Sequence, residues 1–293
     1  MVCPTAAQRP DTFAMDYPNT AQRGTVLDME IEPDSRPLAL RVDALTREFG
    51  DVRAVDELSF HVERGEVYGL LGPNGAGKTT TLRILAGMMQ PTSGSVEVLG
   101  TRPGDNLIEL RRRLGYLTAD TGLYARLTPR EVLTFFARVS GMSDSQVSYR
   151  IERLKDELGL GEFIDRRCEK LSSGQTQRTA IARALVHEPD VLIVDEPTAT
   201  LDVLAAQFIL KRLRTEADSG KAVLLSTHHL SEAELVCDRI GVIHRGRLCG
   251  EGTVSELKQA TGADSLTEAF LRLVTDAPDG AETLPVEITE AVT

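Results

Sequence analysis

The sequence lacks any apolar run that approaches the roughly 18 residues needed to cross a bilayer. Its longest apolar runs are short, as at Val191–Val194 and Ala222–Leu225, and predict buried strands. The four cysteines form no Cys-x-x-Cys pair and have no ligand-like spacing, so we expect reduced, unpaired thiols. Residues 1–20 carry Pro, Gln, Asp and Asn where a secretory signal has an apolar core. We therefore expect a cytoplasmic protein that works at a membrane only through another chain.

Basic residues are also in short supply, and the net charge of −11 is unevenly distributed. Residues 1–36 hold three Arg against six acids, and residues 276–293 hold five acids and no base, which gives −3 and −5. The remainder has 30 bases and 33 acids, which argues against a broad nucleic-acid surface, although not against a local basic patch. Since neither end shows sustained hydrophobic periodicity, we predict disordered tails at residues 1–36 and 276–293, the second of them acidic.

Residues 37–275 have the mixed pattern of an α/β domain. Apolar and polar residues alternate at Leu38–Leu45 and Val55–Val62, which predicts half-buried strands of an N-terminal antiparallel β portion. Further strands are expected at Glu66–Leu71, Val191–Val194 and Val223–Ser226, a helix at Lys78–Met88, and a closing hairpin at Arg239–His244 and Arg247–Gly250. Alternation of strands and helices favours a largely parallel sheet that helices cover.

A mainly helical stretch, from about residue 117 to 187, interrupts this alternation. Pro129 can occupy the first turn of one helix, and Ser143 or Asp144 can cap the next. The stretch lies between two predicted buried strands, so we expect an inserted helical subdomain.

A phosphate-binding loop is indicated at Gly72–Thr79, which fits the pattern G-x-x-x-x-G-K-[ST] in full. It follows a predicted strand and opens a predicted helix, a context that a chance glycine-rich turn would not supply. Gly75 and Gly77 allow backbone N–H groups to surround phosphate oxygens, and the helix N-terminus adds a favourable dipole. Lys78 can reach the β- and γ-phosphates, and the Thr79 hydroxyl can ligate Mg²⁺. The loop predicts ATP binding.

Paired carboxylates at Asp195 and Glu196 end the apolar run Val191–Val194. A buried parallel strand places such residues at its carboxyl end, where α/β proteins bind their ligands. Asp195 would hold Mg²⁺ through water, and Glu196 would orient or deprotonate the attacking water. Such a pair alone is equally typical of a solvated strand end, and its combination with the phosphate loop favours hydrolysis.

The segment Leu171–Gln175, with the sequence LSSGQ, lies 20 residues before Asp195. Together with Gln177–Leu185, it resembles the LSGGQ signature and following helix of ABC-type ATPases. The resemblance covers residues 38–273, with the motifs in the family's order and spacing. It implies a P-loop NTPase core with a mostly parallel sheet, an N-terminal antiparallel β portion and an inserted helical subdomain.

The resemblance also implies a partner, because two such domains pack head to tail and enclose each ATP between the loop of one and the signature of the other. Ser172, Gly174 and Gln175 would then face the ATP held by a second copy of this chain. A helix N-terminus near Gly174 is consistent with a second anion site. A separate polytopic membrane protein is the other implied partner, with this chain peripheral on the inner face of the cell membrane; no nucleic-acid partner is expected.

Further roles follow from single matched positions. Phe49 matches the aromatic that stacks on adenine, although a core phenylalanine is the alternative. His228 matches the switch histidine that contacts the γ-phosphate and holds Glu196, whereas His229 falls at a variable position and is expected to be structural or solvated. Leu201-Asp202 matches the loop that crosses between the domains.

Together, motifs and resemblance give catalytic Glu196, His228 and Lys78, metal ligands Thr79 and Asp195, and ATP contacts at Phe49, Gly72, Pro73, Asn74, Gly75, Ala76, Gly77, Lys78, Thr79, Thr80, Ser172, Gly174 and Gln175.

Two positions depart from the family pattern. Ser173 replaces the second signature glycine, which would cost about 1 kcal/mol if that backbone needs a positive φ. Ala119 stands where the family usually has a glutamine that touches Mg²⁺, with Asp120 or water as the substitute. The stretch Leu114–Val132 resembles the sodium-export branch, and Ser265–Leu271 resembles the end of multidrug- and sodium-exporter ATPases.

The expected function is the ATP-hydrolysing subunit of an ABC transporter, which powers export, with sodium ions as one candidate cargo. Drug export within the same family is an alternative, as is a soluble ABC-type ATPase that remodels nucleic acid or ribosomes. The single motif set and the lack of heptads and cysteine pairs argue against that soluble class. A nucleotide-binding regulator with weak turnover is the third alternative, against which the intact Lys78, Asp195, Glu196 and His228 argue.

Overall fold

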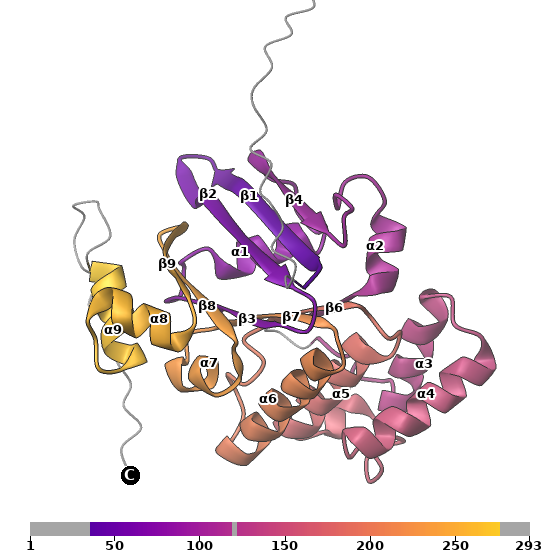
Figure 1. Cartoon of the computed structure of the whole chain (residues 1–293). Helices are drawn as coiled ribbons and strands as arrows, with labels where there is room; N and C mark the ends of the chain where they lie inside the picture. The colour runs from indigo at the N-terminus through magenta and orange to yellow at the C-terminus, as the bar shows by residue number, and fades with distance from the viewer. Residues whose placement is uncertain (1–35, 119–121, 276–293) are drawn as a thin grey trace, which may run out of the picture. The chain divides into compact units, whose positions relative to one another are not determined.

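The computed structural model describes residues 36–118 and 122–275 (Figure 1). The predicted tails, apart from Arg36, and the positions Ala119 and Asp120 lie outside the described residues. No helix of the described part is long and apolar enough to cross a membrane.

An antiparallel sheet is formed by the strands β1 (Leu38–Phe49), β2 (Val52–Glu63) and β4 (Ser93–Val98), in the order β2-β1-β4. The antiparallel N-terminal portion is thereby confirmed. A tight turn joins β1 and β2, and Gly50 in it takes a φ of 57°, which is readily accessible only to glycine. Phe49 thus lies at the tip of a hairpin.

A mixed, mostly parallel sheet contains six strands in the order β5-β6-β7-β3-β8-β9. Only β9 runs antiparallel to its neighbour among the pairs of this sheet. The strands are β3 (Val67–Leu71), β5 (Leu114–Leu117), β6 (Val191–Asp195), β7 (Ala222–Thr227), β8 (Arg239–His244) and β9 (Arg247–Gly252). Parallel register brings the carboxyl ends of β3, β6 and β7 to one edge, with Leu71 opposite Thr227 and Asp195 opposite Ser226.

The strands β3, β6 and β7 are buried along their whole length, because both faces of the sheet are covered. Their alternate residues enter two different cores. Val194 and Leu225 pack with the helices α3 to α6, whereas Ile193 and Leu224 pack with α1 and the antiparallel sheet. Figure 1 shows α1 between the two sheets and α5 and α6 on the opposite side of the mixed sheet.

The described helices are α1 (Lys78–Leu85), α2 (Leu107–Arg113), α3 (Pro129–Val139), α4 (Asp144–Glu157), the 3-10 turn η1 (Cys168–Lys170), α5 (Ser173–Leu185), α6 (Val203–Asp218), α7 (Leu230–Val236), α8 (Val254–Thr261) and α9 (Leu266–Thr275). Pro129 opens α3 behind a capping box of Thr128 and Glu131. Ser143, rather than Asp144, caps α4.

The helix that begins at Lys78 ends at Leu85, so the predicted end at Met88 was wrong. Gly87 adopts a φ of 67°, and a residue in the left-handed region cannot continue the helix.

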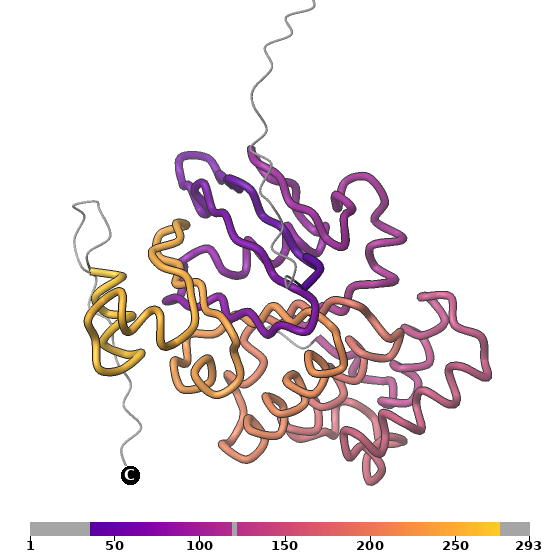
Figure 2. Tube along the Cα trace, viewed as in Figure 1, coloured from indigo at the N-terminus to yellow at the C-terminus, as the bar shows by residue number. Residues whose placement is uncertain are grey.

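Strand β2 of the antiparallel sheet contacts the β8–β9 hairpin of the mixed sheet, although the two lie far apart in the sequence. Figure 2 shows the indigo strand β2 next to the orange β8–β9 hairpin. There the Asp56 N–H donates to the Gly246 carbonyl at 2.9 Å, and Asp56 also accepts hydrogen bonds from Arg53 and Arg247. This contact fixes the antiparallel sheet against the loop that follows β3, since Gly246 N–H donates to the Ala76 carbonyl at 2.9 Å.

Candidate active site

The phosphate loop passes close to neighbouring backbone at two of its glycines. A Cβ on Gly72 would lie 2.2 Å from the Ile243 carbonyl oxygen, and one on Gly77 would lie 2.4 Å from that of Ala54. Gly75 has free space around the Cβ position but takes a φ of 80°. Packing therefore requires glycine at two positions, and backbone conformation requires it at the third.

Lys78 is buried, with 4% of its surface exposed, at the start of α1. Its Nζ donates to the carbonyls of Gly72 at 2.6 Å and Pro73 at 3.1 Å, and lies 3.3 Å from Oε1 of Glu196. Burial lowers the pKa of Lys78, and the nearby Glu196 carboxylate opposes that shift. The ammonium group thus lies between the phosphate loop and the end of β6. Thr79 and Thr80 follow in the first turn of the same helix.

Two carboxylates meet this group at the end of β6. Asp195 is 1% exposed and accepts a hydrogen bond from the Ser226 hydroxyl on the neighbouring strand β7. Glu196 takes a φ of 44°, a left-handed conformation that costs a non-glycine residue on the order of 1–3 kcal/mol. Its N–H donates to the Ser226 carbonyl at 3.0 Å. The unusual backbone turns the Glu196 side chain toward Lys78 instead of continuing the strand.

His228 reaches the same carboxylate from the end of β7. Its Nδ1 lies 2.8 Å from Oε2 of Glu196, while Lys78 approaches Oε1. The rings of His228 and His229 lie 4.1 Å apart between centroids. The structure thus brings together the three predicted catalytic residues Lys78, Glu196 and His228, with Asp195 adjoining them.

The signature segment begins helix α5. Ser172 is its N-cap, and a capping box joins Ser172 Oγ to the Gln175 N–H at 3.3 Å and Gln175 Oε1 to the Ser172 N–H at 3.1 Å. Ser173 is the first helical residue and is not among the residues of positive φ, so serine causes no backbone strain there. A Cβ on Gly174 would have only the Ala205 Cβ within 4 Å, at 3.8 Å. The helix N-terminus therefore has space beside Gly174 for a larger group.

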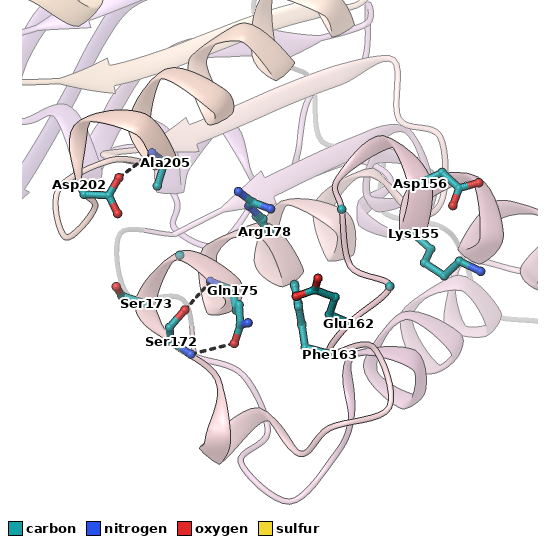
Figure 3. A pocket seen from close by; sticks show the side chains of 13 residues that line it. Lys155, Asp156, Glu162, Phe163, Ser172, Ser173, Gln175, Arg178, Asp202 and Ala205 are labelled. Atoms are coloured by element: carbon teal, nitrogen blue, oxygen red, sulfur yellow. Dashed lines mark hydrogen bonds between the residues drawn. The ribbon is translucent and has the colours of Figure 1, made fainter.

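A cavity of about 660 Å³ opens beside this helix end (Figure 3). Its lining includes Ser172, Gly174, Arg178, Phe163 and Asp202, and none of the residues of the phosphate loop. Figure 3 shows Arg178 between Asp202, which caps α6, on the left and Lys155 on the right, with the signature residues Ser172 and Ser173 below Asp202. The signature of one chain therefore lines a cavity to which the phosphate loop of the same chain contributes no residue.

Phe49 is an exposed aromatic at the tip of the β1–β2 hairpin, with 44% of its surface accessible. The alternative of a core phenylalanine is therefore excluded. The Arg47 guanidinium lies 4.6 Å from the centre of its ring and covers one face. Arg47 was missed in the sequence, although its position two residues before Phe49 on a strand places both side chains on the same face of the sheet.

Other polar contacts near Glu196 were also missed. The Gln177 Nε2 donates to the Pro197 carbonyl at 2.5 Å, and the Glu232 carboxylate accepts from Thr198 Oγ1 at 2.5 Å and Thr227 Oγ1 at 3.0 Å. No local pattern in the sequence signals the contacts of Pro197 and Thr198, because their partners lie 20 and 34 residues away in other elements.

The chain matches known proteins over most of its described length. The family model described as "ABC transporter" matches residues 55–199. The probable multidrug ABC transporter ATP-binding protein YbhF of Escherichia coli is 38% identical over 237 residues, which are 79% of this chain and 41% of that protein. The chain thus corresponds to less than half of that relative.

Two shorter relatives match over most of their own length. The ABC transporter ATP-binding protein NatA of Bacillus subtilis is 36% identical over 221 residues, 75% of this chain and 90% of NatA. The Nod factor export ATP-binding protein I of Paraburkholderia xenovorans is 43% identical over 219 residues, 75% of this chain and 72% of that protein.

Solved structures agree with these matches. An ATP-binding subunit of an ABC transporter superposes with a TM-score of 0.75 at 33% identity, over 80% of this chain and 99% of that one. CbiO1 of Clostridium perfringens, part of the transporter complex CbiONQ, gives 0.69 at 28% identity, over 76% of this chain and 92% of that one. The ATP-binding cassette MJ0796, solved as a dimer with ADP and phosphate, gives 0.67 at 25% identity over 73% and 98%.

Proposed function

This chain belongs to the ABC transporter family of ATP-binding proteins, and we propose that it binds and hydrolyses ATP to power export through a separate membrane-spanning partner. The observation that carries the proposal is the bridge that Glu196 makes between Lys78 and His228. Phosphoryl transfer needs charge stabilisation and a positioned nucleophile more than covalent chemistry. The bridge holds a buried ammonium group, a carboxylate and an imidazole together, and this supports binding of phosphate beside a carboxylate that could activate water.

The geometry and the family resemblance support the following roles. The backbone N–H groups of Gly72–Gly77 would surround the β-phosphate, with the Lys78 ammonium directed to the β- and γ-phosphates. Glu196 would orient the attacking water and accept its proton, while the His228 imidazole holds the carboxylate and reaches the γ-phosphate. Phe49 would stack its free face on adenine, since Arg47 covers the other.

Mg²⁺ suits the donors that this site offers. Asp195 supplies a carboxylate and Thr79 a hydroxyl, and Mg²⁺ prefers oxygen ligands in combination with phosphate oxygens and water. Within residues 36–118 and 122–275, no group of three or more His, Cys, Asp or Glu could hold a metal by itself. The ATP phosphates would therefore complete the coordination, and the ion would neutralise charge on them.

A second copy of this chain completes the proposed site. Ser172, Gly174 and Gln175 lie at a helix N-terminus beside a cavity that the phosphate loop does not line. A helix N-terminus favours an anion, and the γ-phosphate bound by another copy provides one. The dimeric state of MJ0796 supports this arrangement.

The export partner is proposed from the relatives, whose names refer to multidrug transport and Nod factor export. CbiO1 is part of a complex with other components, and by analogy this chain would lie on the cytoplasmic face of a membrane as a peripheral subunit. Sodium ions or a drug-like solute are the candidate cargoes. Reconstitution with the membrane protein encoded beside it, followed by a test of which solute stimulates ATP turnover, identifies the cargo.

The test of the activity itself is phosphate release by the purified chain with Mg²⁺ and ATP. Lys78→Ala should weaken ATP binding at least about tenfold, since hydrogen bonds to charged groups contribute about 1.5–3 kcal/mol. Lys211→Ala, which changes an exposed lysine of α6, is the matched control. Phosphate release that is equal in the Lys78→Ala variant and the unaltered chain would refute the proposed site.

A further inference from the structure

The turn after Asp195 is held at three consecutive residues by three different elements. The Glu196 N–H donates to Ser226 of β7 at 3.0 Å. The next carbonyl, of Pro197, accepts from Gln177 of α5 at 2.5 Å, and the Thr198 hydroxyl donates to Glu232 of α7 at 2.5 Å. Only the first of these bonds follows from the strand pairing of the mixed sheet.

Gln177 makes its contact in a buried setting, with 6% of its surface exposed. It belongs to the same helix whose N-terminus carries the Ser172–Gln175 capping box, two residues earlier. A proline carbonyl is a strong acceptor, and its burial without a partner would be costly. Gln177 thus ties the signature helix to the residue that directly follows Glu196.

Glu232 joins the two loops that carry the proposed catalytic side chains. One carboxylate oxygen accepts from Thr198, after Glu196, and the other accepts at 3.0 Å from Thr227, which precedes His228. The Thr227 hydroxyl in turn accepts from the His229 N–H at 3.0 Å, so its own hydrogen is free to point at Glu232. Both threonines are buried, at 5% and 1% exposure, which restricts their hydroxyls to these partners.

Such support has a reason in the backbone of Glu196. A non-glycine residue at φ 44° is strained, and strained conformations persist only where the surroundings hold them. If the turn relaxed, the Glu196 carboxylate would leave the bridge between Lys78 and His228. A catalytic group that shifts by about 1 Å can lose on the order of a hundredfold in rate.

We propose that Gln177 and Glu232 are positioning residues that hold the Pro197–Thr198 turn and so aim Glu196 at the attacking water. The inference rests on the proposed ATPase function. Gln177 also connects two sites. Its helix α5 would present Ser172 and Gly174 to another copy, and through Gln177 the same helix holds the catalytic turn of its own chain. Engagement of the signature and alignment of Glu196 are thereby mechanically joined.

The test compares Gln177→Ala and Glu232→Ala with the unaltered full-length chain. Each should lower kcat by about tenfold or more, with ATP affinity within about twofold, since the hydrogen bonds of both side chains go to Pro197, Thr198 and Thr227 and not to the phosphate loop. Glu232→Gln keeps the shape and one acceptor oxygen and should restore part of the rate. Glu234→Ala, on the same helix and exposed, is the matched control.

Amide hydrogen exchange supplies a readout that does not depend on turnover. Exchange in a peptide that covers residues 196–201 should rise about fivefold or more in both alanine variants, and not in Glu234→Ala, because local opening follows the loss of local contacts. Rates are compared at a temperature at which circular dichroism finds every variant folded.

These measurements distinguish failure of the proposed ATPase function from failure of the positioning role of Gln177 and Glu232. An unaltered chain that binds ATP without hydrolysing it refutes the proposed function, and unchanged exchange in the 196–201 peptide then refutes the positioning role as well. Hydrolysis by the unaltered chain together with kcat within twofold in both alanine variants refutes the positioning role alone. A loss of ATP affinity as large as the loss of rate also refutes it, since the two residues would then support nucleotide binding.

Discussion

Nδ1 of His228 lies 2.8 Å from Oε2 of Glu196, on the side of the carboxylate opposite Lys78. Lys78 follows the loop after β3, and His228 directly follows β7. The position of the carboxylate, which follows β6, therefore depends on the register of these three strands. A bound γ-phosphate would compete for Lys78, whereas the His228 contact could persist. In the proposed mechanism His228 would orient the carboxylate, and the loss of the Lys78 contact to phosphate would free its other oxygen for water.

Substitution of Glu196 by glutamine tests its role as the base. Glutamine keeps the size and a hydrogen-bonding oxygen but cannot accept a proton from water, so hydrolysis should fall about 10²- to 10⁴-fold. ATP binding should persist, and the bound ATP should hold two copies together. Phosphate release and light scattering with ATP measure the two effects.

Glu188→Gln is the control for that substitution. Glu188 is another non-glycine residue of positive φ, at 54°, and its carboxylate lies beside Arg150 rather than Lys78. It should keep the rate of the unaltered chain. A Glu196→Gln variant that hydrolyses ATP at that same rate would remove Glu196 from the mechanism.

Much of the site could be predicted from the sequence because its motifs are local. The phosphate loop needs only its own backbone and the two flanking elements, and Asp195 and Glu196 directly follow an apolar strand. The convergence of Lys78, Glu196 and His228 follows from the family's spacing, since parallel strands bring their carboxyl ends to one edge. Four predicted strands lie within the observed β1, β2, β6 and β7, because the periodicity or the apolar run that predicts each of them is also local.

The contacts of Gln177 and Glu232 could not be predicted, because each joins residues of separate elements. Glutamine and glutamate in an amphipathic helix are usually solvent-exposed, and only the packed fold turns Gln177 inward. The third strand of the antiparallel sheet, β4, was likewise not identified. It pairs with β1, a segment about fifty residues away, and a pattern of neighbouring residues cannot predict so distant a contact.

Removal of the Phe49 ring should weaken ATP binding. Stacking of a base on an aromatic side chain contributes about 1–3 kcal/mol, so Phe49→Ala should raise the Kd for ATP between about fivefold and a hundredfold. Phe49→Tyr should keep most of the affinity, because the face of the ring remains. Equilibrium binding of a fluorescent ATP analogue measures both.

Val52→Ala, at the other end of the same turn, is the control for stacking. Val52 is 66% exposed and pairs with Phe49 across the hairpin, so its loss perturbs the same turn without removing an aromatic face. Equal losses of affinity in the two alanine variants would show that the hairpin conformation, and not stacking, holds the nucleotide.

Gly72 should contribute to the stability of the fold as well as to phosphate binding. An added Cβ would lie 2.2 Å from the Ile243 carbonyl of β8, a backbone atom that cannot rotate away. Gly72→Ala should therefore lower the free energy of unfolding by about 1–3 kcal/mol, as overpacking does. Gly104→Ala, with nothing within 4 Å of its Cβ, should stay within about 0.5 kcal/mol in the same urea titration. Equal stability of the two variants would contradict this close approach.

Gly174 provides the sharpest test of the second copy. An added side chain there has room within its own chain, since the Ala205 Cβ lies 3.8 Å away, and a negative charge suits a helix N-terminus. Gly174→Asp should therefore fold and bind ATP normally as a monomer. Against a γ-phosphate bound by another copy the same charge is repulsive, by several kcal/mol, so ATP-dependent association should weaken at least about a hundredfold. Light scattering in the Glu196→Gln background, with Gly104→Asp as the control, measures the association, and an undiminished dimer would exclude the head-to-tail site.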